Sequence, residues 1–247
     1  MKYIIGNLKM NFSYDEAKNY FEELKKDSTT SANYVGVCVP SIYLELAVNI
    51  FKNSNVAVGA QNIFYENSGA YTGEISVPMI KSMGCQLALV GHSERRAKFG
   101  ETNEDVNKKM QACFNAAITP ILCVGETLAE REDGKTLVVI EEQLSAALKE
   151  IKDLSQKTFF IAYEPVWAIG TGVSATTQDA KSVISHIKQF MISNFGENNS
   201  LQVLYGGSLT ASNAKDILNG PEIDGGLVGG ASLKVESFNG IYNFNQT

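Results

Sequence analysis

The amino-acid sequence predicts an α/β protein whose eight parallel strands close into a (β/α)8 barrel. Three observations support this prediction: eight short apolar runs recur along the 247 residues, segments with helical spacing separate them, and polar residues follow the runs. Strand and helix alternating about every 30 residues is typical of a parallel sheet. Eight such repeats in about 250 residues match the size of one closed barrel.

The eight apolar runs are rich in β-branched, aromatic and small residues. Because their apolar character is continuous, they are expected to be strands buried on both faces. They span residues 3–8, 34–39, 56–61, 86–91, 118–124, 159–163, 201–205 and 224–229. An open, doubly wound sheet is the alternative architecture, and the number of repeats favours the barrel.

Four of the intervening segments carry the apolar stripe of a helix packed on a sheet. Ser13 and Glu16 have the spacing of a capping box, so the first helix is expected to begin there. The four stripes are Ala17, Phe21 and Leu24; Val106, Met110, Cys113 and Ala117; Leu137, Ile140, Leu144, Leu148 and Ile151; and Ala180, Val183, Ile187 and Met191.

Composition excludes several classes of protein. Hydrophobic residues make up 44% and charged residues 19% of the chain, as in ordinary globular proteins. The net charge of −6 leaves no basic stripe for nucleic acid. No segment resembles a signal peptide or a membrane span of roughly 20 apolar residues. We therefore expect one domain over residues 1–247, in the cytoplasm, without nucleic-acid or membrane partners.

The cysteines give no sign of a metal site or a disulfide framework. They stand at positions 38, 85, 113 and 123, no two form a C-x-x-C pair, and the chain has only two histidines. We expect reduced thiols in a core and no bound metal.

Unusual polar residues and glycines stand just past the apolar runs. The carboxyl ends of barrel strands form the face on which barrel enzymes keep their chemistry. The residues at these positions are Asn7 and Lys9, Gln61 and Asn62, His92, Glu126, Glu164, Gly206 to Ser208, and Gly229 with Gly230. A functional site is therefore expected at this end of the barrel.

Three of these residues suit acid–base chemistry. Glu164 emerges from the sixth run and Pro165 stiffens the chain behind it, so Glu164 is a candidate base, although it could be an exposed loop residue. His92 opens a short helical segment whose positive end would keep its ring neutral, whereas His186 lies within a helical stretch and is interpreted as structural. Lys9 is either a solvated strand end or an inward cation for an anionic substrate.

Glycines follow the seventh and eighth runs, in Gly206-Gly207-Ser208 and Gly229-Gly230. Each group precedes an expected helix, where backbone N–H groups could approach a phosphate. Barrels build phosphate sites from these two loops, although tight turns alone would also use glycine. Two other patterns are dismissed: residues 134–136 lack the first glycine of a P-loop, and residues 170–175 lie too far from a strand end for a dinucleotide site.

Seven motifs together resemble one family. In order they are GNLKMN, GAYTGEIS, GHSERR, CVGETLAERE, AYEPVWAIGTG, YGGS and GGASLK. They resemble the triosephosphate isomerase family from Gly6 to about Tyr242, and AYEPVWAIGTG with GHSERR is highly specific. The resemblance implies a TIM barrel that interconverts dihydroxyacetone phosphate and D-glyceraldehyde 3-phosphate through an enediol(ate), in glycolysis and gluconeogenesis. It implies no metal or organic cofactor.

The resemblance also implies residue roles. Glu164 matches the general base, His92 the neutral group that polarises the carbonyl, and Lys9, with Asn7 beside it, the cation near developing negative charge. Glu94 matches a supporting carboxylate paired with a neighbouring cation. The positions implied to hold substrate and phosphate are Asn7, Lys9, Gly170, Ser208, Gly229 and Gly230.

Two segments would complete such an enzyme. The first is a lid that closes over the phosphate and excludes water. It comprises Pro165, Val166, Trp167, Ala168, Ile169, Gly170 and Thr171. The second is residues 61–76, which are long for a βα loop. By resemblance, this loop docks into a second copy with Thr72 near that copy's Asn7, so a homodimer is expected.

Two other functions share part of this pattern. A different phosphate-binding barrel isomerase would have the glycine sites but would not need Lys9, His92 and Glu164 together. A catalytically silent binding protein on the same fold would be marked by loss of one of these three residues, and all three are present.

Overall fold

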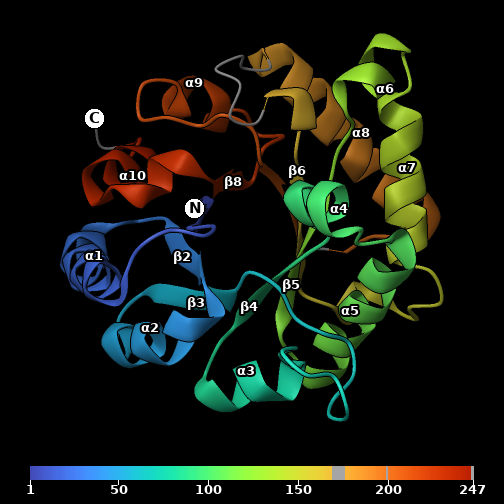
Figure 1. The fold of residues 1–247 in the computed structure, drawn as a ribbon. Coiled ribbons are helices and arrows are strands. Elements are labelled where there is room, and N and C mark those ends of the chain that lie inside the picture. Colours follow the sequence, from blue (N-terminus) through green and yellow to red (C-terminus); the bar gives the residue numbers. More distant parts are fainter. Residues whose placement is uncertain (169–175, 199, 246–247) are drawn as a thin grey trace.

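The computed structural model describes residues 1–168, 176–198 and 200–245. Eight parallel strands form a closed barrel ringed by helices, and β1 pairs with both β2 and β8 (Figure 1). The strands are β1 (Tyr3–Asn7), β2 (Tyr34–Val39), β3 (Val56–Ala60), β4 (Leu87–Val90), β5 (Thr119–Val124), β6 (Phe159–Tyr163), β7 (Leu201–Tyr205) and β8 (Gly225–Val228). Each lies within one of the eight apolar runs, so the predicted fold class is confirmed.

The helices connect successive strands around the outside of the barrel. They are α1 (Tyr14–Asp27), α2 (Leu44–Phe51), α3 (Val77–Met83), α4 (Ser93–Phe99), α5 (Asn103–Ala116), α6 (Leu128–Glu132), α7 (Thr136–Ala147), α8 (Thr177–Phe195), α9 (Ala214–Leu218) and α10 (Val235–Tyr242). Short 3-10 turns are η1 (Ser28–Thr30), η2 (Ser41–Tyr43), η3 (Leu154–Gln156), η4 (Val166–Ala168) and η5 (Gly230–Leu233). As predicted, a capping box starts α1, in which the Ser13 N–H donates to Glu16 Oε2 at 2.7 Å.

Two predicted apolar stripes extend beyond their helices. Ala117 caps α5 with a left-handed φ of 55°, so it lies outside that helix. Helix α7 ends at Ala147, and the backbone becomes left-handed at Glu150 (φ 63°). Ile151 therefore packs on the core from an irregular segment, while Leu137 is 40% exposed. These stripes correctly located the helices but overestimated their extent.

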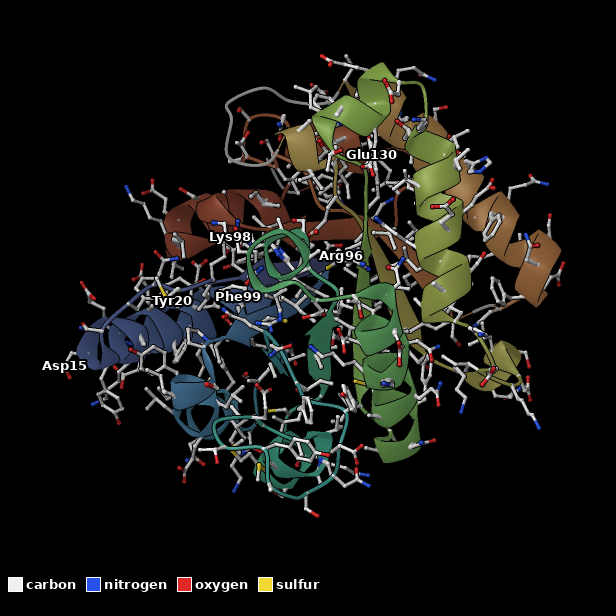
Figure 2. The ribbon with its side chains drawn as sticks, turned by 45° about the vertical axis from the view of Figure 1, so that its right-hand side comes forward. Asp15, Tyr20, Arg96, Lys98, Phe99 and Glu130 are labelled. Atoms are coloured by element: carbon white, nitrogen blue, oxygen red, sulfur yellow. The ribbon has the colours of Figure 1, made fainter. Side chains whose placement is uncertain are left out.

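Alternating strand residues divide the core into two layers. Ile5 points into the barrel and its neighbour Ile4 packs beneath the helices, as the period of two along a strand requires. Polar side chains such as Asp15 and Lys98 lie on the outer surface (Figure 2). All four cysteines are buried and free. No helix in the described part of the chain is long and apolar enough to cross a membrane.

A buried charge cluster fixes the turn that leads from β4 into α4. Glu101 is 8% exposed, and its carboxylate accepts from the Gly91 N–H at 3.0 Å, from Lys109 Nζ at 3.0 Å and from Arg95 Nε. Burial opposes ionisation of Glu101, but Lys109 and Arg95 outweigh burial and hold its pKa below the usual value. Because Gly91 immediately precedes His92, this cluster supports the candidate site.

We expect Glu101→Gln to lower the free energy of unfolding by about 3–5 kcal/mol at pH 7, because it leaves the buried Lys109 and the half-buried Arg95 without their carboxylate. The folded-state pKa of Glu101 is lowered. The stabilisation is therefore complete above the ordinary glutamate pKa of about 4.3 and is lost as the pH falls through the folded value. Urea unfolding of both proteins between pH 7 and pH 3 should show the difference shrinking with acidification.

Glu104→Gln is the matched control, because Glu104 pairs with Lys108 on the surface, where its side chain is 77% exposed. Surface pairs contribute little, so this variant should unfold like the wild type. Equal urea midpoints for Glu101→Gln and the wild type at pH 7 would contradict the role given to Glu101.

Candidate active site

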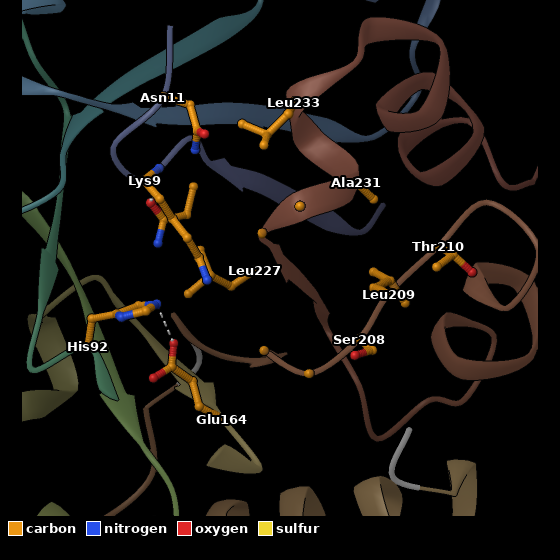
Figure 3. Close-up of a pocket in the computed structure, with 15 residues that line it drawn as sticks. Lys9, Asn11, His92, Glu164, Ser208, Leu209, Thr210, Leu227, Ala231 and Leu233 are labelled. Atoms are coloured by element: carbon orange, nitrogen blue, oxygen red, sulfur yellow. Dashed lines mark hydrogen bonds and ion pairs between the residues drawn. The ribbon is translucent and has the colours of Figure 1, made fainter. Parts of the chain in front are cut away.

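A cavity of about 330 Å³ opens at the carboxyl ends of the strands (Figure 3). Its walls come from the loops after β1, β4, β6, β7 and β8. The sequence-predicted residues that line it are Asn7, Lys9, His92, Glu164, Ser208, Gly229 and Gly230. Glu94 and Thr72 lie outside this cavity, and Gly170 lies outside the described residues.

Glu164 directly follows β6 and is almost fully buried. Its Oε2 accepts from the Ser93 N–H at 2.9 Å, and its Oε1 lies 3.0 Å from His92 Nε2. Glycines flank it closely: a Cβ on Gly206 would come 2.9 Å from Glu164 Cγ, and one on Gly125 would come 1.7 Å from its carbonyl oxygen. The neighbouring loops therefore hold this carboxylate in one place.

His92 is the N-cap of α4, and its ring faces the cavity (Figure 3). The Nδ1 atom accepts the Glu94 backbone N–H at 3.2 Å, so it carries no hydrogen. The ring hydrogen is therefore on Nε2, where it donates to Glu164 Oε1. This pattern describes a neutral imidazole with its proton directed at the cavity.

Lys9 is held by its backbone and by its side chain. Its φ is 51°, an uncommon value for a residue other than glycine. Its N–H donates to Asn7 Oδ1 at 3.0 Å, and its carbonyl accepts from Gln61 Nε2 at 2.9 Å. Lys9 Nζ donates to Glu94 Oε1 at 2.7 Å. Burial opposes ionisation of Glu94, but Lys9 outweighs it and lowers the Glu94 pKa.

The loops that carry Gly206-Gly207-Ser208 and Gly229-Gly230 form another wall of the cavity. Gly229 precedes η5, and a Cβ on it would come 3.4 Å from Lys9 Cε, so the cation and this turn are neighbours. The helix expected after Gly206-Gly207-Ser208 is α9, but it does not follow directly and begins only at Ala214. Instead, Asn213 side-chain bonds to the Thr210 N–H and the Ser208 carbonyl hold the intervening residues in turns.

The first part of the predicted lid is anchored to the barrel. Trp167 Nε1 donates to Glu126 Oε1 at 2.8 Å, and the Arg131 guanidinium lies 4.3 Å from the centre of the indole ring. The Ser208 hydroxyl donates to the Ala168 carbonyl at 2.9 Å. The remaining predicted lid residues, Ile169, Gly170 and Thr171, lie outside the described residues.

Four residues support the site without having been assigned such a role from the sequence. Ser93 holds Glu164, Gln61 holds Lys9, and Glu126 and Arg131 hold Trp167. The positions of Gln61 and Glu126 after strands were visible signals, whereas Ser93 and Arg131 act through contacts that sequence spacing does not reveal. Within the described ranges, no group of three or more His, Cys, Asp or Glu residues could hold a metal ion.

Comparisons with known proteins show which family the chain belongs to. The family model described as triosephosphate isomerase matches residues 2–245. Triosephosphate isomerase from Moorella thermoacetica is 45% identical over 98% of both chains, and that from Endomicrobium trichonymphae is 46% identical over 98% of this chain and 97% of its own. The crystal structure of triosephosphate isomerase from Bartonella henselae is 34% identical, with a TM-score of 0.90, and covers 100% of this chain and 99% of its own. The chain belongs to the triosephosphate isomerase family.

Proposed function

We propose that the chain interconverts dihydroxyacetone phosphate and D-glyceraldehyde 3-phosphate, the aldose–ketose isomerisation of glycolysis and gluconeogenesis. The observation that carries this proposal is the convergence of Lys9, His92 and Glu164 on one cavity. A carboxylate, a neutral imidazole N–H and an ammonium group are there within reach of one small anionic molecule. Membership of the triosephosphate isomerase family supports the same reaction.

Proton transfer between two adjacent carbons uses each of these groups. Glu164 takes a proton from the carbon beside the carbonyl, the C–H electrons form the enediolate double bond, and the carbonyl electrons move onto oxygen. The Nε2–H of His92 and the charge of Lys9 stabilise that oxygen. Glu164 then returns the proton to the neighbouring carbon. His92 carries the hydroxyl proton from the first oxygen to the former carbonyl oxygen, so that the old hydroxyl becomes the new carbonyl and the old carbonyl a hydroxyl. Because His92 Nε2 donates to Glu164 at rest, a substrate oxygen would replace this acceptor.

The phosphate lies, in this proposal, against the turn at Gly229 and Gly230. A Cβ on Gly230 would meet no atom within 4 Å, so the cavity is open there. Ser208, Asn7 and Lys9 line the same cavity, and Gly170 of the lid completes the proposed set. Backbone N–H groups and one ammonium can bind a dianion despite the net charge of −6.

The proposal also includes the domain organisation, a reaction without a cofactor, and the location of the protein. Residues 1–247 act as one domain, and the chemistry above uses side chains without a metal or organic cofactor. Four free, buried cysteines suit the reducing cytoplasm, where we place the protein.

A homodimer is the proposed assembly. Large apolar side chains are exposed, with Met10 at 96%, Ile42 at 76% and Phe99 at 69%. Met10 and Phe99 line a second cavity, of about 520 Å³, that also reaches Lys9 and Glu94. The loop of residues 61–76, which carries the exposed Thr72, is the segment proposed to enter this cavity of a second copy.

Glu164→Gln should lower kcat about 10²- to 10⁴-fold while KM stays within about tenfold, since the amide keeps the shape but accepts no proton. The assay supplies glyceraldehyde 3-phosphate and couples the ketone product to detection. Glu132→Gln changes an exposed glutamate of α6 and should retain wild-type kinetics. Near wild-type turnover by Glu164→Gln would remove this residue from the mechanism, and an inactive wild type would refute the function itself.

Thr72→Arg should yield monomers with a much lower kcat, because a charge forced into a subunit pocket is costly unless paired. Light scattering at matched concentration measures the assembly. Ser155→Arg places the same charge on exposed η3, before β6, and should leave the dimer intact. A Thr72→Arg protein that still has the mass of a dimer would contradict the proposed docking.

A further inference from the structure

Tyr20 lies on α1 and contacts two loops of the proposed phosphate side of the cavity. Its hydroxyl donates to the Ser232 carbonyl at 2.6 Å, and both residues are buried. Figure 2 labels Tyr20 where α1 meets α10, the helix that follows η5. None of the motifs noted in the sequence includes Tyr20, and it does not line the cavity.

The hydroxyl of Tyr20 supports the turn at Gly229 and Gly230. Ser232 belongs to η5, and its N–H and its hydroxyl both donate to the Gly229 carbonyl, at 2.9 and 2.7 Å. The Ser232 carbonyl is in turn held by Tyr20. Burial, with a smaller contribution from Glu23, raises the pKa of Tyr20, so the hydroxyl keeps the proton that it donates.

The ring of Tyr20 supports the loop that carries Lys9. It stacks on Phe12 with centroids 5.2 Å apart and ring planes 25° apart. Phe12 has a φ of 74°, a conformation uncommon for an aromatic residue, and its carbonyl accepts from the Tyr43 hydroxyl at 2.8 Å. Since Phe12 stands three residues after Lys9, the stacked pair limits how that loop can shift.

We propose that Tyr20 is a positioning residue that joins the loop carrying Lys9 to the turn that holds the substrate phosphate. The ring contacts one loop and the hydroxyl contacts the other, so one side chain limits how far Lys9 and Gly229 can shift relative to each other after strand pairing has brought them together. The identity of the ligand rests on the proposed function. The positioning itself rests on the contacts of Tyr20 with Phe12 and Ser232.

Tyr20→Phe tests the hydroxyl because it removes one hydrogen bond and keeps the ring. Calorimetric titration with inorganic phosphate should show Kd raised roughly two- to tenfold, the range expected for one net hydrogen bond. KM for glyceraldehyde 3-phosphate should rise by a similar factor. We expect kcat to stay within about twofold, because Lys9, His92 and Glu164 keep their own partners.

Tyr242→Phe is the matched control. Its hydroxyl donates to Asp27, so the variant also loses the hydrogen bond of a buried tyrosine, here a partly buried bond between α1 and α10, but Tyr242 does not line the cavity. This variant should lose stability and keep wild-type values of Kd and KM. If Tyr20→Phe behaves in the same way, Tyr20 is merely structural and the proposal is wrong.

Tyr20→Leu tests the ring, since it removes both the hydroxyl and the stacking partner of Phe12. We expect kcat to fall at least threefold below that of Tyr20→Phe, because Lys9 then loses the support of its loop; an equal kcat would refute the role of the ring. The phosphate titration needs no turnover. A wild type that binds phosphate without isomerising triose phosphates would refute the proposed function and leave this test intact.

Discussion

The pairing of β1 with β8 is the constraint on which the rest of the structure depends. Tyr3 lies beside Gly225 in this register, and a Cβ on Gly225 would come 1.8 Å from the Tyr3 carbonyl oxygen. Closure between β1 and β8 brings the first and last strands together. It places Lys9, which follows β1, against Gly229, which follows β8, and so creates the wall to which the phosphate is assigned. An open sheet would leave these residues at opposite edges.

The loop after β1 combines this placement with local strain. Lys9 and Phe12 both have left-handed backbones, a conformation that costs of order 1–3 kcal/mol per residue at functional sites. Asn7 and Gln61 hold the backbone of Lys9, while Tyr43 and Tyr20 hold Phe12. The hydrogen bonds and ring contacts that offset the strain also determine where the ammonium group can lie.

Most of the fold could be predicted from the sequence, because strands buried on both faces leave continuous apolar runs. The ends of α5 and α7 could not, since Ala117 and Ile151 continue the apolar pattern after each helix has stopped, although Ala117 is exposed and only Ile151 is half-buried. The chemical groups of the candidate site were also readable, because Lys9, His92 and Glu164 each follow a strand. Two of the residues that support them were not readable: Ser93 reaches Glu164 across 71 positions, and Tyr20 reaches Ser232 across 212. Such pairs become visible only once barrel closure has brought the loops together.

The first turn of α4 determines which groups of the site carry a hydrogen. The Glu94 N–H points at His92 Nδ1, and the Ser93 N–H points at Glu164 Oε2. A second proton on the ring would set an N–H against the Glu94 N–H, and two opposed donors are unfavourable in a site where His92 is 6% exposed. The first turn of α4 therefore keeps the imidazole neutral. It also gives the Glu164 carboxylate a hydrogen bond from a backbone N–H, a group that does not release its hydrogen. Proton acceptor and hydrogen-bond donor then remain distinct groups whose reactive atoms lie 3.0 Å apart. Such a pair can serve a carbon and the oxygen of an adjacent carbonyl at the same time.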